Sequence, residues 1–97
     1  MKLLNSLFRP KASPMAEYER VASVIEAFVA GTGDAWDWDD LTARRQHDPF
    51  LESIRLRCVK VPDTYPPAKA GTAYCNDEGM RVLSGLASEV RAKLSAP

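Results

Sequence analysis

The chain has 97 residues, which is enough for one small domain with a modest hydrophobic core. Its composition, 45% hydrophobic and 27% charged, is typical of a soluble globular protein and unlike that of disordered or collagen-like chains. Thirteen basic residues balance thirteen acidic ones, so the whole molecule offers no broad field for nucleic acid or an anionic membrane, and no apolar run approaches the roughly 20 residues of a membrane span.

Residues 1–12 are basic and amphipathic. Their large apolar side chains recur at helical spacing: Leu3, Leu4, Leu7 and Phe8. Their positive charges are Lys2, Arg9 and Lys11. Because so short a piece does not form a stable helix alone, we expect it to be mobile or to dock on a single helical domain formed by residues 13–97. Contact with a partner protein or a membrane surface is the alternative for this segment.

Strong signals at both ends predict a helix over residues 14–30. Ser13 is suited to accept a hydrogen bond from the first turn, and Pro14 stands where no amide N–H is needed. Apolar residues then follow at steps of three and four: Tyr18, Val21, Ala22, Ile25, Phe28 and Val29. Gly31 is the residue type that commonly ends a helix.

A short second helix is predicted over residues 38–45. Asp37 is suited to cap its first turn, where further aspartates match the positive end of the helix dipole. Arg44 and Arg45 match the negative end in its last turn. One of the two nearby tryptophans is expected in the core, and Trp36 is the better candidate for exposure.

A third helix is predicted over residues 49–61, starting at Asp48-Pro49 and ended by Pro62. A strand is the alternative, because residues 54–58 alternate between apolar and polar side chains. The helix is favoured, since a lone strand has no partner for its backbone hydrogen bonds. As a helix, the segment leaves Leu56 and Val59 on the side away from the core, where they need a second cover.

The fourth helix is predicted over residues 77–94, with Asn76 as its cap. Its apolar stripe has steps of three and four: Met80, Leu83, Ala87, Val90 and Leu94. Together these patterns predict an all-α protein, a small irregular bundle of about four helices over residues 14–30, 38–45, 49–61 and 77–94.

No arrangement of side chains in the sequence makes a strong catalytic or metal-binding motif. The aspartates of residues 34–40 lack the alternating positions of a calcium loop, so capping and solvation explain them. His47 has no local nucleophile motif beside it. We therefore expect no catalytic residue, metal or cofactor, and a protein that is not an enzyme.

The two cysteines bear on the cellular compartment. Cys58 and Cys75 form no CxxC pair, and the sequence has no convincing export signal. The simplest interpretation is two reduced, mostly buried thiols in a cytoplasmic protein. A disulfide between them stays open at this point.

The function favoured by the sequence is a protein-interaction or accessory module that binds a protein partner or itself. Its candidate partner-binding residues are Trp36, Leu56 and Val59. The split between acidic residues 31–40 and basic residues 42–60 suits docking on a charged protein.

Nucleic-acid binding is the alternative function. Residues 38–60 have the order helix, short turn, helix, which resembles the layout of a helix-turn-helix unit. The cations available to contact phosphates are Arg44, Arg45, Arg55, Arg57 and Lys60. The turn lacks the usual glycine and the overall charge is zero, so this alternative ranks second.

Overall fold

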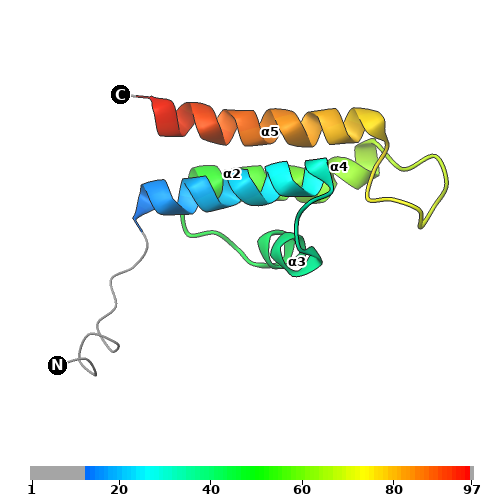
Figure 1. Ribbon diagram of the computed structural model, residues 1–97, viewed down its shortest axis with the longest axis horizontal. Coiled ribbons are helices and arrows are strands. Elements are labelled where there is room, and N and C mark those ends of the chain that lie inside the picture. The colour runs from blue at the N-terminus through cyan, green and yellow to red at the C-terminus, as the bar shows by residue number, and fades with distance from the viewer. Residues whose placement is uncertain (1–12, 97) are drawn as a thin grey trace, which may run out of the picture.

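The computed structural model describes residues 13–96, and all the regular structure in that range is helical. The four helices are α2 (Pro14–Ala30), α3 (Ala35–Ala43), α4 (Pro49–Thr64) and α5 (Asp77–Ser95). Each packs against two others, so that the contacts follow the ring α2–α5–α4–α3 and back to α2. In Figure 1, α5 lies along one side of α2 and α4, running opposite to α2, and α3 lies on the other side. The predicted all-α bundle is confirmed.

The first helix has the predicted bounds. The Ser13 hydroxyl accepts a hydrogen bond of 3.1 Å from the Ala16 backbone N–H, and Pro14 opens the helix. Gly31 ends it with a φ of 74°, in the left-handed region that favours glycine. The prediction for residues 1–12 lies outside the described residues.

The second helix begins and ends earlier than predicted. Asp34, not Asp37, is its N-cap, and the Asp34 carboxylate accepts a hydrogen bond of 2.8 Å from the Trp36 backbone N–H. Asp37 lies in the first turn, where its charge still matches the dipole. Arg44 has an extended backbone and stands at the C-cap, so the two arginines do not form the last turn.

The third segment is a helix, and its predicted end at Pro62 is wrong, because α4 continues to Thr64. A proline inside a helix leaves the carbonyl four residues earlier without its N–H donor. Here that carbonyl belongs to Cys58, and the Tyr74 hydroxyl donates a hydrogen bond of 2.8 Å to it. A side chain from the loop before α5 thus supplies the donor that Pro62 lacks.

The last helix has the predicted cap and ends one residue later than predicted. Asn76 accepts a hydrogen bond of 2.9 Å from the Gly79 backbone N–H through its side chain. Its own backbone N–H donates to the Tyr65 carbonyl at 2.9 Å, which joins the end of α4 to the start of α5. The loop between the two helices is therefore fixed at its base.

The core lies inside the ring of helices and draws on all four of them. Its fully buried members include Ile25, Leu41, Ile54, Leu83 and Val90. No helix within residues 13–96 combines the length and apolar character needed to cross a membrane.

Arginine side chains join helices at the surface. Arg91 of α5 binds Glu19 and, at 2.7 Å, Glu26, both on α2. Arg57 of α4 binds Glu89 of α5 through two hydrogen bonds of 2.9 and 2.8 Å. These ion pairs link α5 to α2 and to α4 at the surface.

Candidate interaction surface

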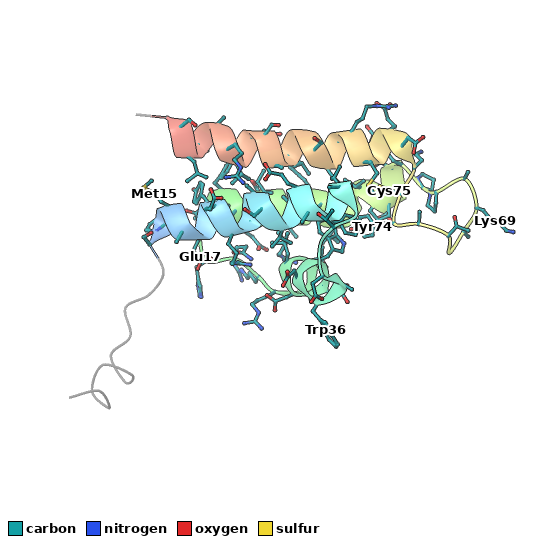
Figure 2. All side chains as sticks on the ribbon, viewed as in Figure 1. Met15, Glu17, Trp36, Lys69, Tyr74 and Cys75 are labelled. Atoms are coloured by element: carbon teal, nitrogen blue, oxygen red, sulfur yellow. The ribbon has the colours of Figure 1, made fainter. Side chains whose placement is uncertain are left out.

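Trp36 is the most exposed large apolar side chain in the described part of the chain, with 79% of its surface accessible. Because α3 buries Trp38 and Leu41, Trp36 falls on the opposite side of the helix. Figure 2 shows its side chain pointing away from the other helices. The prediction that Trp36 is the exposed tryptophan is confirmed.

Acidic side chains surround Trp36 on the outward side of α3. Asp37, Asp39 and Asp40 are all exposed. Asp40 is paired with Arg44 at 3.0 Å, whereas Asp37 and Asp39 have no ion pair within residues 13–96. We call Trp36, Asp37, Asp39 and Asp40 the α3 surface: a large indole set among carboxylates, two of which are unpaired.

Trp38, by contrast, belongs to the core, with 5% of its surface accessible. Its ring stacks on Phe28 with the centroids 3.9 Å apart and the planes 7° from parallel. Tyr74 stands nearly perpendicular to it, with a centroid distance of 5.3 Å. The indole N–H of Trp38 is buried without a hydrogen-bond partner in the described structure. The aromatic stack anchors α3 to α2 and fixes the direction in which Trp36 points.

Leu56 and Val59 lie on the outward side of α4, where 45% and 39% of their surfaces are accessible. The sequence predicted that a helix would leave them away from the core, and the rest of residues 13–96 covers them only in part. The three predicted partner-binding residues therefore stand on two neighbouring helices, with Trp36 on α3 and the aliphatic pair on α4.

Most of the cations predicted for nucleic-acid contact are already paired. Arg55 binds Glu52 at 2.6 Å and donates to the Thr42 carbonyl at 2.7 Å. Arg57 is held by Glu89, and Arg44 by Asp40, at 2.8 and 3.0 Å. Arg45 and Lys60 are exposed and have no ion pair among the described residues. The local positive surplus of residues 42–60 is thus largely neutralised.

Two surface pockets in the described part of the chain are relevant to function. The larger has a volume of about 740 Å³ and is lined by His47 and its neighbours in the α3–α4 loop and by residues from α2, α3 and α4. Two of its polar side chains, Asp48 and Tyr18, link α4 to α2. Asp48 caps α4 by accepting from two backbone N–H groups at 2.9 and 3.1 Å, and it also accepts from the Tyr18 hydroxyl at 3.0 Å. Burial, together with this hydrogen bond, raises the pKa of Tyr18. The described lining of this pocket contains no serine, threonine or cysteine that could act as a nucleophile with His47.

The smaller pocket, of about 270 Å³, lies between α2 and α3. Phe28 and Trp38 contribute aromatic surface to it, and Asp34 and Asp37 contribute carboxylates. Because these aspartates flank Trp36 in the sequence, the pocket borders the α3 surface.

The cysteines are free and buried. Burial raises the pKa of the Cys58 thiol to about 12 and also raises that of Cys75, so neither forms a reactive thiolate near neutral pH. The described residues contain no group of three or more side chains able to hold a metal ion.

Comparisons with known proteins give no match: no family model, no curated protein and no solved structure has significant similarity to this chain. The geometry of the surface itself is therefore what indicates a function.

Sequence reasoning did not identify Asp34 and Phe28 as pocket residues. Asp34 and Asp37 carry equally good local capping signals, and only the inward packing of Trp38 selects the earlier one. Phe28 was predicted for the core, and it does pack there, but it also reaches the surface at the end of α2. No local pattern distinguishes these roles.

Proposed function

We propose that this protein is a non-enzymatic interaction module that binds another protein through the α3 surface. The observation that carries the proposal is the 79% exposure of Trp36 on a helix whose other tryptophan is packed in the core. A tryptophan can bury about 150–250 Å² in an interface, and such aromatic anchors dominate binding energies.

Charge supports a protein partner with basic groups. Asp37 and Asp39 are exposed and unpaired within residues 13–96, and they follow Trp36 on α3 by one and three residues. Carboxylates around an apolar anchor steer a complementary surface toward it and suppress wrong partners. Leu56 and Val59 provide a second apolar contact on the neighbouring helix α4.

Two further observations agree with this proposal. Several polar groups of the larger pocket are engaged in capping and hydrogen bonding, as with Asp48 and Tyr18. The two free, buried thiols suit a reducing compartment, and we propose the cytoplasm as its location.

The proposal is tested by affinity capture from the native host, using the tagged full-length chain. We expect a protein captured by the wild type to be lost with Trp36→Ala and retained with Ser88→Ala, an exposed position on α5. Leu56→Glu tests the α4 contact in the same way. Because Trp36 contributes little to the core, its variant keeps the wild-type thermal midpoint. Capture of the same proteins by Trp36→Ala, or of none by the wild type, would contradict the proposal.

A further inference from the structure

The smaller pocket opens beside the α3 surface and has its own chemistry. Asp34 lines the pocket, and its carboxylate accepts a hydrogen bond from the backbone N–H of Trp36. Asp37, which also lines the pocket, follows Trp36 in the same turn of α3. A partner anchored on Trp36 therefore passes next to this pocket. Its volume of about 270 Å³ is below the range of about 300–1,000 Å³ typical of drug-sized ligands and suits a single long side chain.

One wall of the pocket is aromatic. Phe28 and Trp38 stack almost parallel at 3.9 Å, and both line the pocket. The aliphatic part of a lysine or arginine side chain packs well on such an apolar wall.

The electrostatic environment of the pocket is negative. The two carboxylates, Asp34 and Asp37, have no ion pair among the described residues. The one cation in the lining, Arg20, is bound to Glu17 at 3.3 Å. In addition, the last turn of α2, which contributes Ala27 and Phe28, contains no basic residue to offset the negative end of its dipole.

The positive end of the α3 dipole opposes these charges, because α3 begins at the pocket. That end is equivalent to about half a positive charge. Two full carboxylates outweigh it, and one of them, Asp34, already satisfies the first-turn N–H of Trp36.

From this geometry we infer that the pocket between α2 and α3 receives a lysine or arginine side chain of the partner protein that docks on Trp36. The inference rests on the proposed function and specifies the chemistry of the partner. The cation contacts Asp34 and Asp37, and its aliphatic stem packs against Phe28.

The test is an NMR titration of the full-length protein with N-acetyl-lysine amide and N-acetyl-arginine amide, compared with the uncharged N-acetyl-norleucine amide. The indole N–H of Trp38 is a suitable reporter because that ring lines the pocket. We expect a saturable shift of its resonance with the two cationic amides and none with norleucine. Removal of one exposed carboxylate by Asp37→Asn weakens binding about fivefold.

Trp36→Ala separates this inference from the proposed function. Trp36 does not line the pocket, so this variant keeps the response to the cationic amides even though it loses the partner protein. Equal shifts with norleucine, no shift with either cation, or unchanged binding by Asp37→Asn would overturn the inference.

A further variant examines the basic residues of this chain as an alternative source of the cation. Lys2, Arg9 and Lys11 are replaced together by glutamine in the full-length chain. If this triple variant shifts the Trp38 indole resonance in the absence of any amide, the occupant is the chain's own N-terminal segment, and a partner side chain is ruled out. An unchanged resonance supports the partner.

Discussion

At the scale of single residues, the Tyr74 hydroxyl compensates for the hydrogen-bond donor that Pro62 lacks. Pro62 has no N–H for the Cys58 carbonyl, and the Tyr74 hydroxyl donates to that carbonyl at 2.8 Å. Burial is the main cause of a Tyr74 pKa raised to about 12, so the hydroxyl keeps its proton at neutral pH and remains a donor.

Tyr74→Phe is expected to lower the free energy of unfolding by about 1–3 kcal/mol, because it leaves a buried carbonyl unsatisfied. Urea unfolding measures the loss, and Tyr65→Phe, which removes a hydroxyl with no hydrogen bond in the described structure, is the control. Pro62→Ala restores a backbone N–H at position 62. In that background Tyr74→Phe costs less, whereas equal costs in both backgrounds would show that the hydroxyl does not replace the missing donor.

Two glycines of α5 provide a second residue-scale prediction with opposite signs. A Cβ on Gly79 would lie 2.8 Å from the Cys75 Cβ and Sγ atoms and 3.0 Å from the Tyr65 Cβ, whereas a Cβ on Gly85 meets nothing within 4 Å. Gly85→Ala therefore gains helix propensity without a clash, and we expect it to raise the free energy of unfolding by up to about 1 kcal/mol. Gly79→Ala overpacks the contact between α5 and the preceding loop, and we expect this overpacking to lower the free energy of unfolding by about 1–3 kcal/mol. Equal shifts in urea midpoint would refute the close packing at Gly79.

At the scale of elements, the α3–α4 junction is held by one glutamate and one arginine. The Glu52 carboxylate accepts a hydrogen bond of 2.8 Å from the Gln46 backbone N–H and forms an ion pair with Arg55. Arg55 in turn donates a hydrogen bond to the Thr42 carbonyl at the end of α3. The hydrogen bond from Arg55, then that from Gln46, lowers the pKa of Glu52 from 4.5 to about 2.

This junction predicts a specific acid response. Because the Glu52 pKa is lower in the folded state, its contribution to stability is complete above about pH 4.5 and is lost as the pH falls toward about 2. Glu52→Gln is expected to lower the thermal midpoint at pH 7 and to flatten its decline between pH 4.5 and 2. Arg55→Met, which removes the ion-pair partner of Glu52, is expected to flatten the decline of the thermal midpoint over the same pH range. If the thermal midpoint of Glu52→Gln declined with acid as steeply as that of the wild type, groups other than Glu52 would cause the acid sensitivity.

The helix starts at Pro14, Pro49 and Asp77 could be predicted because caps are local: a short polar side chain and a nearby proline or acid identify each one. The start of α3 could not, because Asp34 and Asp37 compete and the packing of Trp38 on Phe28 decides between them. The donor that replaces the missing N–H of Pro62 comes from Tyr74, which lies 16 residues from Cys58 in the sequence, so no local rule could find it.

At the scale of the whole molecule, the ring of four helices leaves exposed apolar side chains on α3 and α4, in addition to Met15 in the first turn of α2. Their exposure was predictable from helical periodicity, which places Leu56 and Val59 opposite the core face. The pocket beside Trp36 could not be predicted from the sequence, since it depends on how α2 and α3 are placed relative to each other. Nucleic-acid binding stays a prediction; it requires an affinity that falls steeply with salt and depends on Arg55 and Arg57.

Photo-cross-linking in the native host examines whether Trp36 anchors a protein interface. The 97-residue chain carries a benzoylphenylalanine at position 36 in one strain and at position 88 on α5 in another. We expect a discrete cross-linked adduct with a protein partner from position 36 and none from position 88. Equal yields from the two positions, or no adduct at position 36 from a correctly folded chain, would show that Trp36 is not an interface anchor.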